Sequence, residues 1–195
     1  MLEARQGRVG RYAMGCRYTC ANEFVVGECG MSSFKEMEAV SKIKSLIRLK
    51  EIDKEKCWAA KVQEVKRGMK IKTKWDWRVD FMLRIAGWAY VEWDEENIRN
   101  KKNRVKQQVR DRVTKIWRED MMDKTSLKIY REGKSDRGVE NGLYDNSVGS
   151  ILFADARAGM LDTMVYKAKY MDVSDICRLC GVEREDIRHV VLEKN

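Results

Sequence analysis

The residues with the clearest capacity for chemistry lie near the end of the chain. Cys177 and Cys180 form a CxxC pair followed directly by Gly181, and the single histidine of the protein, His189, comes shortly after. In a CxxC pair, two thiolates on one tight turn can reach the same tetrahedral ion at about 2.3 Å. A glycine relieves such a turn, and a histidine on a following helix can add a third ligand. We therefore predict a zinc site formed by Cys177, Cys180 and His189.

A structural zinc site has four ligands, and the sequence leaves the fourth open. Water, Glu193 or a cysteine from elsewhere are the candidates, whereas Lys194 cannot bind a metal while it is protonated. The alternative interpretation is a free dithiol beside an ordinary histidine. A thioredoxin-like redox pair is disfavoured because no βαβ pattern precedes the two cysteines.

A second group of chemically relevant residues is the basic stretch 99–118. It contains one acid, Asp111, and nine bases: Arg99, Lys101, Lys102, Arg104, Lys106, Arg110, Arg112, Lys115 and Arg118. Exposed helix faces usually pair bases with acids four residues away, and this stretch lacks those acids. We therefore predict contact with a polyanion such as RNA or DNA, with a solvated helix face as the alternative.

Other catalytic arrangements are missing from the sequence. It contains no phosphate-binding glycine loop, no nucleophile elbow and no HExxH motif. Asp145, Asp155 and Asp162 do not form the adjacent carboxylate pair that holds two magnesium ions, so we interpret them as capping and solvating residues. We expect no enzymatic activity and no small-molecule substrate.

The composition also favours a polyanion as partner. The 195 residues carry a formal net charge of +9, which favours an acidic partner. The sequence has no apolar run long enough for a membrane span or a signal peptide, so we expect an intracellular protein, cytoplasmic or nuclear, that is not secreted and has no membrane partner. In that setting the other cysteines should be free buried thiols: Cys16, Cys20, Cys29 and Cys57.

Helices should position these groups, because the chain contains no proline and shows three- and four-residue apolar spacing. Serine and threonine caps and glycine stops predict helices over 33–50, 57–68, 73–87, 94–131 and, as a pair broken at Gly159, 146–165. Residues 133–142 should form an exposed linker. Four tryptophans at helical spacing fit the core better than a base-stacking surface: Trp75, Trp77, Trp88 and Trp93.

Several stretches carry a resemblance to a known family. LEARQGRVGRYAMGCRYTCANEFVVGECGMSSFKEMEAVSKI, KTSLKIYREGK, GLYDNSVGSILFADARAGMLDT and CRLCGVEREDIRHVVLEKN resemble, in this order, the C-terminal region of non-LTR (LINE-type) retrotransposon proteins of arthropods, the tick transposon family. The likeness covers most of the chain and is least distinctive over residues 60–95. The resemblance implies a thumb-like helical region and a terminal zinc knuckle, located downstream of the reverse-transcriptase palm.

Within that family pattern, Cys177, Cys180 and His189 match three knuckle ligands, and the last cysteine of the family falls at Lys194. The chain would then be a fragment or derivative of the element's tail that lacks the catalytic aspartates of the palm. We expect a mainly α fold, a helical bundle with one long basic helix, then a small helical segment and a short zinc-knuckle-like tail. The expected segments are 1–72 (thumb-like), 73–132 (tryptophan-rich and basic), 143–172 (small helical pair) and 173–195 (incomplete knuckle).

The sequence thus predicts a non-catalytic, nucleic-acid-associated tail of a retrotransposon protein, with RNA or DNA and the parent reverse transcriptase as partners and zinc as its one cofactor. Two other functions stay open at this point. One is a helical protein-interaction module, and the other is an expressed transposon relic without activity.

Overall fold

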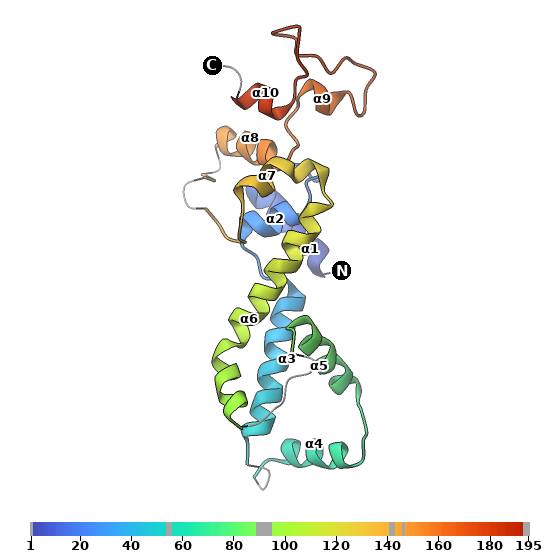
Figure 1. Cartoon of the computed structure of the whole chain (residues 1–195), viewed down its shortest axis with the longest axis vertical. Helices are drawn as coiled ribbons and strands as arrows, with labels where there is room; N and C mark the ends of the chain where they lie inside the picture. The colour runs from blue at the N-terminus through green and yellow to red at the C-terminus, as the bar shows by residue number, and fades with distance from the viewer. Residues whose placement is uncertain (1, 54–55, 89–94, 141–142, 146, 193–195) are drawn as a thin grey trace. The chain divides into compact units, whose positions relative to one another are not determined.

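The computed structural model describes residues 2–53, 56–88, 95–140, 143–145 and 147–192 (Figure 1). These residues form a mainly helical fold, which confirms the predicted α class. Among them, the one element of extended pairing is an isolated antiparallel bridge between Ile176 and Arg184. No helix in the described part of the chain is both long enough and apolar enough to cross a membrane.

The chain divides into two compact units. Unit 1 combines Met1–Met31 with Arg118–Asn195, and unit 2 is the continuous segment Ser32–Trp117. This division differs from the four consecutive segments expected from the sequence, because the N-terminal residues fold with a part of the chain that follows them by more than a hundred positions. No local pattern signals such a pairing.

Unit 2 contains α3 (Phe34–Glu51), α4 (Trp58–Gly68), α5 (Lys74–Ile85) and most of α6 (Glu95–Met122). Helices α3 and α5 pack side by side in this unit (Figure 1). The core residues share complete or nearly complete burial and come from α3, α5 and α6, with Trp88 after α5: Ala39, Ile43, Ile47, Val79, Met82, Leu83, Ala86, Trp88, Val105 and Val109.

The predicted caps of unit 2 are confirmed. The Ser33 hydroxyl accepts a hydrogen bond from the backbone N–H of Glu36 at 3.0 Å. At the start of α5, the Asp76 carboxylate accepts from the backbone N–H and the hydroxyl of Thr73, at 2.7 and 2.6 Å. These bonds satisfy donors that a helix start leaves unpaired and so fix where α3 and α5 begin.

The tryptophans divide between core and surface. Trp88 is buried and Trp75 packs against the core of unit 2, as predicted, but Trp77 is 60% exposed. The core prediction is therefore wrong for Trp77, which follows Trp75 by two residues and so lies on the other side of α5. Trp93 lies outside the described residues.

Unit 1 contains α1 (Leu2–Met14), α2 (Asn22–Cys29), the 3₁₀ helix η1 (Thr125–Leu127) and α7 (Lys128–Gly133). It continues with α8 (Val148–Arg157), α9 (Met164–Lys167) and α10 (Ile187–Leu192). Phe24 and Tyr130 meet edge to face in its core, with ring centroids 4.9 Å apart. The Ser147 hydroxyl caps α8 by accepting from the N–H of Ser150 at 3.1 Å, as predicted.

The predicted break between α8 and α9 also occurs. Gly159 has φ = +71°, and a Cβ placed there would lie 2.1 Å from the carbonyl oxygen of Ser126. Only glycine combines this left-handed backbone with so close an approach.

The long basic helix ends earlier than predicted. The sequence pattern extended it to Arg131, but α6 stops at Met122 and Lys124 has an extended backbone. The guanidinium of Arg131 donates to the carbonyl oxygen of Met122 at 2.9 Å, so an arginine from the next turn satisfies the end of the helix. Neither glycine nor proline marks this end, which is why the spacing of apolar residues did not reveal it.

The prediction of an exposed linker over 133–142 is wrong for Lys134 and Arg137, which are buried. Lys134 and Arg137 are 6% and 4% exposed, and the N–H of Gly138 donates to the carbonyl oxygen of Gly27 at 2.9 Å. The turn-forming residues of this segment predict a solvated loop, but the segment packs along α2. Residues 141 and 142 lie outside the described residues.

Candidate metal centre

The three predicted metal ligands come together in unit 1. One ligand atom each from Cys177, Cys180 and His189 lie within 4.8 Å of one another. Cys177 and His189 are buried, at 1% and 7% exposure, whereas Cys180 is on the surface. The group is therefore buried at Cys177 and His189 and open to solvent at Cys180.

A short loop positions the two cysteines. The N–H of Cys177 donates to the carbonyl oxygen of Glu183 at 2.7 Å, and the N–H of Gly181 donates to the carbonyl oxygen of Cys177 at 2.8 Å. Gly181 has φ = +70°, which lets the chain reverse directly after the second cysteine. The bridge between Ile176 and Arg184 closes the base of this loop.

Helix α10 positions the histidine. Its start is held by the Asp186 carboxylate, which accepts from the N–H of His189 at 2.8 Å. The Nδ1 atom of the ring lies 3.1 Å from the carboxylate of Glu183, and the Nε2 atom lies 3.6 Å from the sulfur of Cys180. One ring nitrogen is thus engaged by a carboxylate while the other faces the thiols, as in carboxylate–histidine–zinc arrangements.

The donor set fits zinc. Zinc–sulfur and zinc–nitrogen bonds of about 2.3 and 2.0–2.1 Å at a tetrahedral angle place sulfur and nitrogen about 3.6 Å apart, close to the separation of Cys180 and His189. Two thiolates and one imidazole are ligands that zinc prefers. The described residues contribute three ligands to the group; Glu193, one of the candidates for the fourth, lies outside them.

The environment of Cys180 favours its thiolate. The backbone N–H groups of Glu183 and Val182 lower the pKa of Cys180 to about 7, with smaller contributions from Cys177 and His189. Thiolate is the form that binds a metal. A large part of this thiol is therefore ready to bind at neutral pH.

Two nearby arginines are neutralised by acids. Arg184 pairs with Asp175 at 2.6 Å, and Arg188 pairs with Glu132 at 2.9 Å. Their charges are thus partly compensated, which reduces the repulsion that a cation bound nearby would meet.

The nine predicted nucleic-acid-binding residues all lie on α6, but their circumstances differ. The side chains of Arg99 and Lys101 lie outside the described part of the chain. Lys102 pairs with Glu51 at 2.6 Å, and Arg118, which belongs to unit 1, donates to the carbonyl oxygen of Ser135 at 2.7 Å. Arg110 is exposed.

The four other bases are exposed: Arg104, Lys106, Arg112 and Lys115. Within the described residues, no acid pairs with any of these four. At 100° per residue, Arg104, Arg112 and Lys115 fall within a sector of about 80°, whereas Lys106 points elsewhere. Three of these four exposed bases therefore share one side of α6.

A second polar cluster in unit 1 was not predicted from the sequence. Glu28 of α2 has a fully buried side chain that accepts from the Tyr144 hydroxyl at 2.5 Å and from the Arg157 guanidinium at 2.9 Å. Lys134 lies 3.6 Å from the same carboxylate and donates to Glu140 at 2.6 Å. Tyr144 and Arg157 belong to the YDNSVGS…ADARAG motif, so this motif holds the core of unit 1 together.

The remaining predicted groups have structural roles. Asp145 accepts from the N–H of Ser147, and the exposed Asp162 lies 3.9 Å from Arg17, which agrees with a capping and solvating role for these two. The prediction is wrong for Asp155, which is 7% exposed and lies 3.5 Å from Arg17. All six cysteines are free, but the burial prediction is confirmed for Cys16 and Cys20 only, because Cys29 and Cys57 are half-buried.

Comparison with known proteins does not identify the chain: no family model matches it, and neither curated proteins nor solved structures give a significant match.

Proposed function

We propose that this protein is a zinc-containing, nucleic-acid-binding module that acts by binding rather than by catalysis. The observation that carries the proposal is the convergence of Cys177, Cys180 and His189, with ligand atoms within 4.8 Å of one another. Small loops that hold zinc through CxxC and histidine commonly present their surface to single-stranded nucleic acid.

The charge distribution supports the choice of partner. The chain carries a net charge of +9, and Arg104, Arg112 and Lys115 share one exposed side of α6. Lysines and arginines that face phosphates release counterions, which makes binding strong at low salt and independent of sequence. We infer that α6 supplies this ionic contribution and that the zinc loop adds contacts to unpaired bases.

The origin that we propose is the tail of a non-LTR retrotransposon protein, with the parent reverse transcriptase as a further partner. The support is the resemblance of four stretches of the sequence, including CRLCGVEREDIRHVVLEKN. Sequencing of genomic DNA that encodes the chain would test this origin. A reverse-transcriptase reading frame directly upstream is expected, and unrelated coding sequence there would contradict it.

A fluorescence-anisotropy titration tests the binding function. Labelled single-stranded RNA, single-stranded DNA and the matching duplexes would be titrated with zinc-loaded protein at two salt concentrations. We expect salt-sensitive binding that favours single strands, weakens in the Cys180→Ser variant and is retained in Cys57→Ser, a control at a half-buried cysteine outside the metal group. Binding that is absent or insensitive to salt would contradict the proposal.

A protein-interaction module is the second candidate, and one observation favours it. Trp77 and Phe81 are 60% and 45% exposed, and they lie one turn apart on α5. Neighbouring exposed aromatic side chains are common in protein interfaces. If nucleic-acid binding is absent while Trp77→Ala abolishes a specific protein complex, this function replaces the first.

A further inference from the structure

Helix α4 presents an exposed row of apolar side chains, which we call the apolar stripe: Trp58, Val62, Val65 and Met69. Their exposed fractions are 82%, 54%, 54% and 66%. The N–H of Met69 donates to the carbonyl oxygen of Val65, so Met69 continues the helical turn beyond Gly68. At 100° per residue the four positions fall within about 60°, along about 16 Å of helix.

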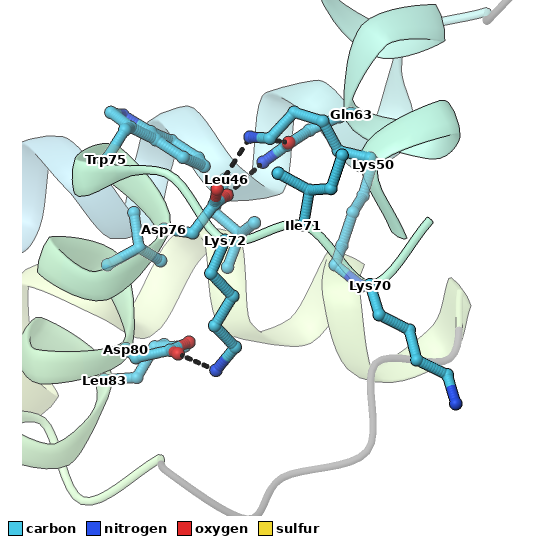
Figure 2. Close-up of a pocket in the computed structure, with 12 residues that line it drawn as sticks. Leu46, Lys50, Gln63, Lys70, Ile71, Lys72, Trp75, Asp76, Asp80 and Leu83 are labelled. Carbon is cyan, nitrogen blue, oxygen red and sulfur yellow. Dashed lines mark hydrogen bonds and ion pairs between the residues drawn. The ribbon is translucent and has the colours of Figure 1, made fainter. Parts of the chain in front are cut away.

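The side of α4 that faces the interior of unit 2 carries the small apolar residue Ala60, which is 3% exposed, and the polar residue Gln63. Gln63 donates to the Asp76 carboxylate at 3.1 Å, and Lys66 pairs with the same carboxylate at 2.7 Å. Figure 2 shows Gln63 and Asp76 facing each other at a pocket of about 410 Å³. An amphipathic helix normally buries its apolar side. In α4 the small Ala60 is buried while the four larger apolar side chains are exposed, so packing within unit 2 does not account for the stripe.

Positive charge surrounds the stripe. The stretch 56–74 contains one acid, Glu64, and seven bases. Three of the bases pair with acids, Lys56 with Asp53, Lys66 with Asp76 and Lys72 with Asp80. The others are Lys61, Arg67, Lys70 and Lys74. The ammonium group of Lys61 lies 5.6 Å from the centre of the Trp58 ring, at one edge of the stripe. A surface that covers the stripe must therefore be apolar where it contacts the four stripe side chains and anionic where it contacts the bases beside them.

This chemistry separates the possible occupants. A second copy of the chain would bring the same excess of bases against this one, and like charges repel one another. Single-stranded nucleic acid binds by stacking bases on aromatic rings, and three of the four stripe residues are not aromatic. An anionic bilayer meets both requirements, because acyl chains accept the apolar side chains while headgroups pair with lysines whose long stems extend beside the helix.

We propose that α4 docks on an anionic lipid surface, with the apolar stripe in the headgroup–acyl boundary and the surrounding lysines on acidic headgroups. The helix lies in the plane of the surface and does not cross it. The sequence-based expectation of no membrane partner rested on the lack of a membrane-spanning segment, and in-plane docking needs none. Peripheral binding of this kind combines apolar burial with the attraction of lysines and arginines to an anionic leaflet. The proposal goes beyond nucleic-acid binding and uses a different part of the molecule.

Flotation with vesicles tests the proposal on the full-length, zinc-loaded chain. The protein would be mixed with vesicles of phosphatidylcholine alone or with about 30 mol% phosphatidylserine, at about 0.1 M salt. We expect the protein to float with the anionic vesicles only. Absence of flotation with them, or equal flotation with neutral vesicles, would overturn the proposal.

Variants locate the contact. Val62→Gln with Val65→Gln removes two stripe side chains and raises helix propensity, so α4 should persist in circular dichroism. We expect a loss of vesicle affinity of about tenfold. The matched control is Val9→Gln with Leu152→Gln, which removes apolar residues of 66% and 53% exposure from helices α1 and α8 and should change affinity less than about twofold.

A positional measurement makes the outcome unambiguous. Lipids brominated in the acyl chain quench tryptophans that enter the bilayer, and Trp58→Phe should remove most of this quenching. If the stripe variant binds vesicles like the parent, if the control loses as much, or if the stripe variant instead abolishes self-association or a protein complex, the lipid proposal is wrong.

Discussion

Unit 1 contains two polar clusters that differ in how the chain assembles them. The candidate metal ligands Cys177, Cys180 and His189 lie within thirteen consecutive residues and are held by hydrogen bonds inside that stretch. The Glu28 cluster joins α2 to Tyr144 and Arg157, partners that are 116 and 129 positions away. The first cluster can form when a short loop closes, whereas the second exists only when the whole unit is folded.

The two clusters therefore have different energetic roles. The three metal ligands are partly open to solvent, and their contribution depends on an added ion. Glu28, with no exposed side-chain surface, requires Lys134 and Arg157 because a buried charge without a partner is costly. The local cluster should control binding, and the long-range cluster should control stability.

The largest expected effect comes from a substitution that breaks the long-range cluster. Glu28→Gln leaves Lys134 and Arg157 without their buried counter-charge and should lower the free energy of unfolding by about 3–5 kcal/mol. Urea denaturation followed by circular dichroism measures it. The control Glu3→Gln, at an exposed position of α1, should change stability by less than about 0.5 kcal/mol. A Glu28→Gln variant as stable as the control would show that the cluster is dispensable.

The second effect concerns the local cluster. Cys180→Ser removes one of three protein ligands and should lower zinc affinity by a factor of about 100 or more, measured by competition with a zinc-sensitive dye. Because Cys180 is exposed, the stability of the metal-free protein should stay the same within about 0.5 kcal/mol. Full zinc stoichiometry in this variant would contradict the metal site.

Features encoded within a few residues could be predicted from the sequence. Ser33 with Glu36, Thr73 with Asp76 and Ser147 with Ser150 determine helix starts through contacts across three positions. The metal ligands belong to the same class, since a turn and one short helix bring them together. For such features, residue type and spacing already contain most of the geometry.

Features that depend on distant partners could not be predicted. Lys134 and Arg137 resemble solvated loop residues, and only the packing against α2 reveals that they are buried. The end of α6 depends on Arg131, and Lys102 is compensated by Glu51 of α3. The sequence likewise indicated amphipathic α4 but not that its apolar side faces outward, because orientation is decided by what the neighbouring helices offer.

The third prediction separates compensated from uncompensated bases. Replacement of Arg104, Lys106, Arg112 and Lys115 by glutamine keeps helix propensity and removes four exposed charges. If the three bases that share one side of α6 each face a phosphate, the slope of log affinity against log salt should fall by about two to three units. The control replaces Lys72 and Lys102, which already pair with Asp80 and Glu51, and should change the slope by less than about one unit. Equal slopes in parent and quadruple variant would mean that α6 is merely solvated.

The smallest effect uses pH to distinguish the clusters. Hydrogen bonds from Lys134 and Arg157 hold the pKa of Glu140 below its usual range, although its side chain is 43% exposed. A lowered pKa stabilises the fold above the unfolded value of about 4.3, and this contribution is lost as pH falls through the folded pKa. For so exposed a pair we expect about 1 kcal/mol or less. Glu140→Gln should therefore differ slightly from the parent in its free energy of unfolding at pH 7, measured by urea denaturation, and match it at about pH 3.

Zinc affinity should instead decline from about pH 7 downward, as protons compete for the Cys180 thiolate, whose pKa is about 7. A pH-independent zinc affinity between about pH 7 and pH 5 would exclude the Cys180 thiolate as a ligand. The proposal that one cluster binds the metal while the other stabilises the fold would then be wrong.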